Sequence, residues 1–170
     1  MKITLSKEQL EYAKVLAAKR HEAKDISFRN SKRLHGNIKK TKVDHYVLDI
    51  THKAHFLGVL GEMAYAQAVN EKIDTNIYEI RDKGFDVGEM EVKASTWMNG
   101  DIELKVQKKH FETKFPKKYI LVRIDENSFH SVEVVGEITR EEFDKNKKIK
   151  QYAPNYPINY IVGVKHLTLL

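Results

Sequence analysis

The sequence predicts one α/β (α+β) domain over residues 1–170, with a central mixed β-sheet flanked by helices and preceded by N-terminal helices. Two observations predict this class. Helical periodicity is concentrated in the first 70 residues and near residue 140, and several segments between them alternate apolar and polar residues as strands do. The order of helix, helix, strands and helix is typical of such domains. We expect a helical part over about residues 1–50 and a core over about residues 51–170.

The first helix is predicted to begin at Ser6, which has Gln9 three residues later as the partner in a capping box. Three apolar residues then recur at helical spacing: Leu10, Ala13 and Ala17. The helix is predicted to end near Ala23. Residues 29–42, "RNSKRLHGNIKKTK", have no apolar period and contain a Gly-Asn pair, so they are predicted to form a loop.

A second helix is predicted over residues 49–69, "DITHKAHFLGVLGEMAYAQAV". Four apolar residues form one stripe along it: Leu57, Leu60, Ala64 and Ala68. Gly58 and Gly61 lie inside this helix, where each glycine costs about 1 kcal/mol relative to alanine. Two such residues indicate that the helix backbone comes close to a sheet or a ligand.

Strands are predicted over six segments: 77–80, 84–87, 90–95, 101–106, 119–124 and 130–136. Within 101–106 the apolar residues alternate cleanly, at Ile102, Leu104 and Val106. The more continuous apolar run "KYILVRI" is typical of a central strand that is buried on both faces. A helix over 139–147 and a strand over 159–164 complete the chain.

Composition narrows the class of protein. Hydrophobic residues make up 41% of the chain, as a folded domain requires, and there is no cysteine, which excludes disulfides and thiolate metal sites. No apolar run approaches the roughly 20 residues that cross a bilayer, so we expect no membrane partner. The N-terminal residues lack the pattern of a signal peptide. We therefore expect a cytoplasmic location.

The charge distribution suggests an anionic partner. The formal net charge is +6, and residues 29–42 hold six Lys or Arg and no acid, while residues 105–118 hold six against one acid. Both stretches are candidates for contacting phosphates, or else are solvated loops. The cationic candidates are Arg29, Lys32, Arg33, Lys39, Lys40, Lys42, Lys108 and Lys109.

The stretch "FDVGEMEVKAS", residues 85–95, is predicted to contain a hairpin whose two-residue loop is Gly88 and Glu89. In that register Asp86 faces Glu91 directly, and alternation places Lys93 on the same face. Apolar residues fill the opposite, core-facing side. Two opposed carboxylates repel unless a positive charge lies between them, and oxygen ligands suit Mg²⁺ or Mn²⁺. With Lys93 positioning an attacking water, the pattern predicts metal-dependent phosphodiester hydrolysis.

The tripeptide Glu-x-Lys is common in this chain, because it also occurs at residues 22–24, 103–105 and 112–114. Those three copies are predicted to be solvated. The copy at 91–93 differs in following both the predicted hairpin acid and the motif "GVLGE" at 58–62. Together with "EVKAS" at 91–95, these residues resemble the PD-(D/E)xK nuclease superfamily, which has the restriction endonuclease-like fold. The likeness covers about residues 52–140 and is closest in kind to small phage-type or Holliday junction resolvase-like members.

The resemblance implies a role for each residue of the motif. Asp86 and Glu91 would be metal ligands together with the Val92 carbonyl, and Lys93 would be the catalytic lysine. Glu62 would join them through a second metal ion or a metal-bound water. Mg²⁺ would be the cofactor, with Mn²⁺ as a substitute.

Several further assignments stay open. Phe85 rather than proline precedes Asp86, and only four residues separate Asp86 from Glu91, so Asp82 is an alternative first acid. Three residues are further candidates for binding nucleic acid: Ser95, Trp97 and Gln107. His52 and His55 lie three apart and are either ordinary histidines on the helix surface or an alternative metal pair, for which no third ligand has suitable spacing; a further alternative is that His55 faces the DNA.

The resemblance implies a Mg²⁺-dependent DNA endonuclease. Because one chain supplies one active site, cutting both strands implies a homodimer. The alternatives are a catalytically inactive nucleic-acid-binding module of nuclease-like fold, a structure-specific junction resolvase, and a nuclease that acts on RNA.

Overall fold

The computed structural model describes residues 1–33, 45–77, 84–96, 102–125 and 127–170. Its elements, in chain order, are β1 (Lys2–Thr4), α1 (Lys7–Arg33), α2 (His45–Val69), β2 (Met90–Ser95), β3 (Glu103–Gln107), α3 (Lys108–Thr113), β4 (Lys118–Ile124), β5 (Ser131–Thr139), α4 (Arg140–Asn146), β6 (Lys148–Lys150), β7 (Asn159–Gly163), the 3-10 helix η1 (Val164–His166) and β8 (Thr168–Leu169).

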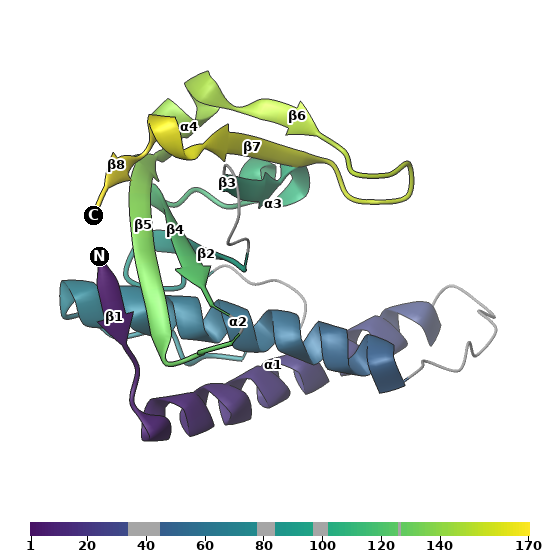
Figure 1. The fold of residues 1–170 in the computed structure, drawn as a ribbon. Helices are drawn as coiled ribbons and strands as arrows, with labels where there is room; N and C mark the ends of the chain where they lie inside the picture. The colour runs from purple at the N-terminus through teal and green to yellow at the C-terminus, as the bar shows by residue number, and fades with distance from the viewer. Residues whose placement is uncertain (34–44, 78–83, 97–101, 126) are drawn as a thin grey trace.

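The strands form two sheets (Figure 1). In the central sheet the order is β1-β5-β4-β2, and β8 pairs with β5 as well. The pair β2–β4 is parallel while the other pairs are antiparallel, so this sheet is mixed. The second sheet is antiparallel, in the order β3-β7-β6. The predicted class, a mixed central sheet flanked by helices, is confirmed.

The central sheet is packed on both faces. Ile120 and Val122 of β4 belong to a core shared with α1 and α2, whereas Tyr119 and Leu121 belong to a second core shared with β3, β7, α3 and α4. Alternate residues of one strand point to opposite faces, so β4 is buried on both. The prediction that "KYILVRI" is a central strand is confirmed, because β4 pairs with both β2 and β5.

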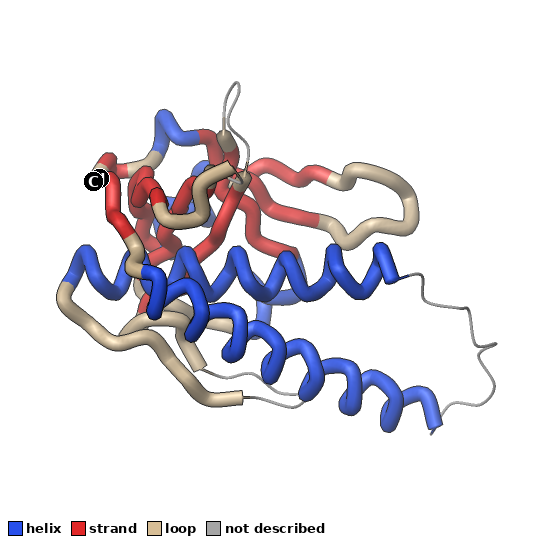
Figure 2. The backbone as a smooth tube through the Cα atoms, turned by 60° about the horizontal axis from the view of Figure 1, so that its bottom comes forward, coloured by secondary structure: helices blue, strands red, loops and turns tan. Residues whose placement is uncertain are grey.

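The two long helices lie side by side, with the strands to one side of them (Figure 2). The predicted capping box opens α1: the Ser6 amide donates to Gln9 Oε1 (2.7 Å), and the Gln9 amide donates to Ser6 Oγ (3.2 Å). The predicted apolar residues of both helices lie in the first core or against it. Residues 1–50 are not helices alone, because β1 joins the central sheet and α2 begins before residue 50.

The predicted end of the first helix is wrong. α1 continues to Arg33, so the candidates Arg29, Lys32 and Arg33 lie on a helix instead of in a loop. Lysine and arginine are good helix formers, and no glycine or proline interrupts residues 7–33. The absence of an apolar period was therefore a poor reason to end the helix. The rest of that predicted loop, including Lys39, Lys40 and Lys42, lies outside the described residues.

The two glycines of α2 differ in their surroundings. A Cβ at Gly61 would lie 2.6 Å from Val122 Cγ2 of the central strand, whereas nothing lies within 4 Å of a Cβ at Gly58. We expect Gly61→Ala to lower the free energy of unfolding by about 1–3 kcal/mol through overpacking. Gly58→Ala is expected to raise it by up to about 1 kcal/mol, since alanine favours the helix. Urea unfolding of both variants checks this, and equal effects would contradict the close helix–sheet contact.

The predicted hairpin is present at its tip but not in its register. Val87 and Met90 form an antiparallel bridge around Gly88, whose φ is +55°. However, the Met90 carbonyl accepts from the amides of both Asp86 (3.1 Å) and Val87 (3.3 Å). Two residues opposite one is a β-bulge. The predicted strand 84–87 and the direct pairing of Asp86 with Glu91 are therefore wrong, and most of the predicted strand 77–80 lies outside the described residues.

Candidate active site

A cleft of about 410 Å³ lies where α1, α2, β2 and the end of α3 meet. The four residues predicted to be catalytic all line it: Glu62, Asp86, Glu91 and Lys93. They come from α2, from the bulge before β2, and from β2 itself. Further polar residues of its wall include Arg20, Asp74, His110 and Lys114.

Glu62 of α2 is buried and is paired with Arg20 of α1. Its two carboxylate oxygens accept from Arg20 Nη1 at 2.8 and 2.9 Å, and Arg20 Nη2 donates to the Asp74 carbonyl at 2.7 Å. Burial, and then the negative charge of Asp86, raise the pKa of Glu62 to about 8 despite this pairing. Glu62 therefore stays hard to ionise even with Arg20 beside it.

The bulge determines where the Asp86 carboxylate points. Asp86 Oδ2 accepts a hydrogen bond from the Val92 amide at 2.7 Å. Burial, and then the charge of Glu91, raise the pKa of Asp86 to about 6, although Lys93 acts in the opposite direction. Because the N–H and C=O of a strand residue point to the same edge, the Val92 carbonyl lies on the strand edge that faces Asp86.

Glu91 is 4% exposed and has two ammonium partners. Lys93 Nζ donates to Glu91 Oε1 at 2.6 Å, and Lys114 Nζ donates to Oε2 at 3.3 Å. Burial acts to raise the pKa of Glu91, but the two lysines together outweigh it, and the pKa lies below its usual value. Glu91 is therefore ionised more readily than Glu62 and Asp86.

Lys114 is a residue that reasoning from the sequence missed as part of the site. It belongs to the Glu-x-Lys copy at 112–114, which was predicted to be solvated, yet its side chain is only 12% exposed and contacts Glu91. That prediction is wrong for Lys114. The basic stretch 105–118 was a sign of it, whereas nothing in the sequence around Arg20 pointed to the cleft.

The chemistry of the donor set fits a hard divalent cation. Asp86, Glu91 and the Val92 carbonyl offer oxygen only, which Mg²⁺ and Mn²⁺ prefer. Burial, and then a neighbouring carboxylate, raise the pKa values of Glu62 and Asp86, and a bound cation would favour the ionised form of both. Among the described residues, no three His, Asp or Glu side chains form a group ready to hold a metal ion. A cation would bind here in place of some of the lysine and arginine contacts.

The other candidates lie in several places. Ser95 ends β2, Gln107 ends β3, and Lys108 and Lys109 begin α3. A second, shallower hollow of about 280 Å³ is lined by Gln107, Lys108 and Lys109 together with Glu112, Pro157 and Ile158. His55 lines the main cleft, with its ring centroid 5.7 Å from that of His21. Trp97 and Asp82 lie outside the described residues, as does the side chain of His52.

Comparison with known proteins gave no match to a family model, to a curated protein or to a solved structure. Within the described part of the chain, no helix has the length and apolar character needed to cross a membrane. The fold and the cleft define a mixed α/β protein with four buried or partly buried carboxylates beside two lysines and an arginine.

Proposed function

We propose that this cleft hydrolyses phosphodiester bonds of DNA with a divalent cation, as a PD-(D/E)xK-type site in a restriction endonuclease-like core. The observation that carries the proposal is the convergence of Glu62, Asp86, Glu91 and Lys93 on one cleft from three segments of the chain. Perturbed carboxyl groups in a cleft are characteristic of functional sites. A solvated Glu-x-Lys pair would not bury its glutamate.

Asp86, Glu91 and the Val92 carbonyl would hold Mg²⁺, or Mn²⁺ in its place, which when bound supplies positive charge and a water of lowered pKa. Lys93, whose ammonium is already directed at Glu91, positions the attacking water and offsets charge on the phosphate. The water oxygen bonds to phosphorus as one ester P–O bond breaks. The leaving oxygen takes up a proton and the water loses one, which yields a phosphomonoester and a hydroxyl.

Arg20 and Lys114 act through the carboxylates instead of on the substrate. Arg20 fixes both oxygens of Glu62 and ties them to the Asp74 carbonyl, so Glu62 keeps one orientation in the cleft wall. Lys114 holds the second oxygen of Glu91 from α3. Both are positioning residues in this proposal. Cutting both strands of a duplex would bring together two copies of the chain.

A second candidate is a nucleic-acid-binding module without catalysis. The observation in its favour is that Glu62 and Glu91 are each engaged by cationic side chains. In that case the ion pairs are structural, and the basic surface binds DNA or RNA whether or not a metal ion is present.

Cleavage assays separate the two candidates. Supercoiled plasmid, a synthetic four-way junction and a matched RNA are incubated with Mg²⁺, Mn²⁺ or a chelator. We expect cutting with either metal and none with the chelator. The cleavage rate of Glu91→Gln is expected to be at least about 100-fold lower than that of the wild type, because an amide is a poor metal ligand. Glu11→Gln is the matched control, because Glu11 forms an exposed ion pair with Lys14 on α1. Tight binding without cutting under every metal would favour the binding module, and the preferred substrate distinguishes a junction resolvase or an RNA-acting enzyme.

A further inference from the structure

The connection between β6 and β7, residues 151–158 or "QYAPNYPI", presents two tyrosines to solvent. Tyr152 is 48% and Tyr156 63% exposed, although tyrosine usually buries most of its ring. In Figure 1 this hairpin extends away from the rest of the second sheet. Two exposed aromatic rings on one projecting loop indicate a surface that meets a partner.

The loop is held by its own hydrogen bonds. Gln151 Nε2 donates to the carbonyls of Pro154 (3.1 Å) and Tyr156 (3.0 Å), and the Tyr156 amide donates to the Ala153 carbonyl (3.0 Å). The ring of Pro154 also fixes its φ. The tyrosines are therefore displayed on an ordered loop, so a partner that binds them has little backbone entropy to remove.

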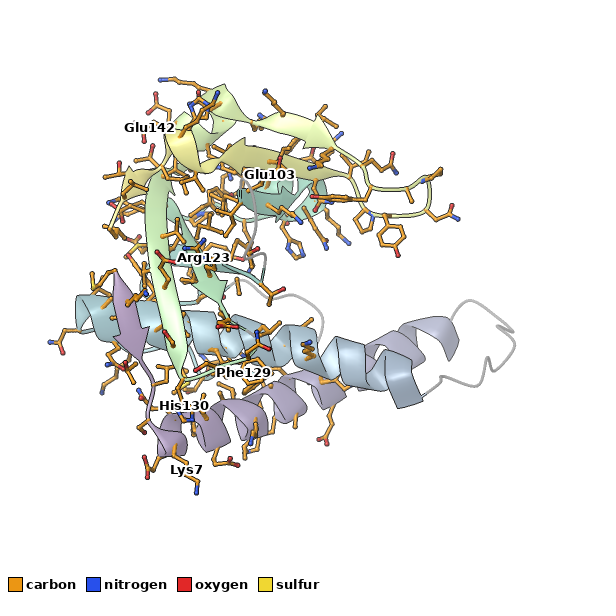
Figure 3. All side chains as sticks on the ribbon, in the orientation of Figure 1. Lys7, Glu103, Arg123, Phe129, His130 and Glu142 are labelled. Carbon is orange, nitrogen blue, oxygen red and sulfur yellow. The ribbon has the colours of Figure 1, made fainter. Side chains whose placement is uncertain are left out.

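Two lysine ammonium groups lie over the ring of Tyr152. Lys105 Nζ lies 4.8 Å and Lys150 Nζ 5.1 Å from the centroid of the Tyr152 ring. Lys150 also donates to Glu103 at 2.7 Å, and Glu103 is labelled on β3 in Figure 3. Residues 145–170 contain five lysines and no Asp or Glu. Both ammonium groups lie over the ring, so a base that stacks on Tyr152 takes the place of an ammonium group, which can then pair with the phosphate of the same nucleotide.

The hairpin is connected to the cleft through α3. The Lys108 amide at the start of α3 donates to the Ile158 carbonyl at the end of the loop (2.9 Å). His110 of α3 and Lys114, just beyond its end, line the cleft. A DNA strand bound to this loop could therefore reach the proposed site of hydrolysis by passing along α3, whose first two residues are lysines.

We propose that the β6–β7 hairpin binds unpaired nucleotides of the substrate by stacking bases on Tyr152 and Tyr156. The proposal rests on the proposed function in taking DNA as the ligand, and it narrows the substrate to DNA that carries a single-stranded segment next to the scissile bond. Backbone contacts from Lys105 and Lys150 hold the strand, and the rings discriminate for bases that are free to leave a duplex.

The test measures binding alone, in a chelator, so that it does not depend on catalysis. Fluorescence anisotropy follows a labelled single strand of about 16 nucleotides, the upper range for one single-strand-binding module, and the duplex of the same sequence. The variants are Tyr152→Ala/Tyr156→Ala and the double phenylalanine variant, which keeps both rings. Tyr12→Ala is the matched control, since Tyr12 is 46% exposed on α1. Thermal unfolding shows whether each variant is folded.

We expect the alanine pair to weaken single-strand binding at least about fivefold per lost stacked base, with a smaller effect on the duplex. The phenylalanine pair and Tyr12→Ala are expected to bind as the wild type does. Equal weakening on both DNAs, or none on either, would overturn the proposal. A change in sedimentation without a change in DNA binding would assign the hairpin to self-association and overturn it too. Loss of single-strand binding in a protein that never cleaves would support the hairpin while rejecting the proposed function.

Discussion

Lys93→Met is expected to lower the rate constant of metal-dependent DNA cleavage by about 100- to 1,000-fold, the effect of removing one donor that stabilises developing charge. Methionine keeps most of the apolar stem and loses the ammonium that contacts Glu91 at 2.6 Å. Glu91 retains Lys114 as a partner, so its buried carboxylate is not left without a cation. The folded structure should therefore survive the change, and the loss should fall on the chemical step.

Single-turnover cleavage with excess protein measures this step separately from DNA binding. Lys14→Met is the matched control, because Lys14 belongs to an exposed ion pair on α1 and has no contact with the cleft. An unchanged cleavage rate in Lys93→Met would show that the residues of β2 are a scaffold and that catalysis occurs elsewhere. An equal loss in both variants would indicate a general effect of charge on DNA binding.

Local sequence patterns predicted the elements whose stability depends on their own residues. The capping box at Ser6 and the alternation of Ile102, Leu104 and Val106 both describe the structure, because each pattern acts within one turn or one strand. The short strands β1, β6 and β8 were not predicted. Each has two or three residues, and its hydrogen bonds come from partners that the sequence does not place beside it.

The motif predicted residues that meet in one cleft, but it did not predict the residues around them. Glu62 and Glu91 reach the cleft as expected, but their partners Arg20 and Lys114 lie 42 and 23 residues away along the chain. No local pattern encodes such contacts. The bulge at Asp86 has a similar origin.

Residues 73 and 74 lie along the other side of the hairpin. Ile73 bridges Val87, and the Asp74 amide donates to the Asp86 carbonyl at 2.9 Å. Tertiary pairing thus overrode the simple register that alternation alone predicted.

The free energy of unfolding is expected to fall as pH rises from 5 to 8, and Asp86→Asn is expected to make this fall smaller. The folded-state pKa of Asp86 is about 6, above its ordinary value of 3.8, and that of Glu62 is about 8. Over this range the folded protein binds more protons than the unfolded chain, so stability decreases as pH rises. The lowered pKa of Glu91 makes the free energy of unfolding rise with pH instead. This effect occurs at lower pH, where the unfolded chain takes up protons.

Asparagine removes the charge and keeps an oxygen that accepts from the Val92 amide. For a folded-state pKa near 6, the variant is expected to be more stable than the wild type at both pH values, and roughly twice as much at pH 8 as at pH 5. Urea unfolding in a chelator measures the difference in stability between the two proteins at each pH. Both proteins contain the same histidines, so the contribution of the histidines to the pH dependence cancels in this difference. A gain that is equal at both pH values would show that Asp86 is ionised throughout.

The same pair of proteins tests why a destabilising carboxylate is present. If Asp86 is a metal ligand, Mg²⁺ at about 100 times its dissociation constant should stabilise the wild type at pH 8 by about 2.7 kcal/mol and leave Asp86→Asn unchanged. Glu11→Gln should respond as the wild type does, since Glu11 lies on an exposed part of α1. Stabilisation of Asp86→Asn to the same extent would place the cation elsewhere. The stability lost to an ionised Asp86 would then reflect its burial and the charge of Glu91 with no metal ion to offset them, and the cleft would fit the binding module better than the nuclease.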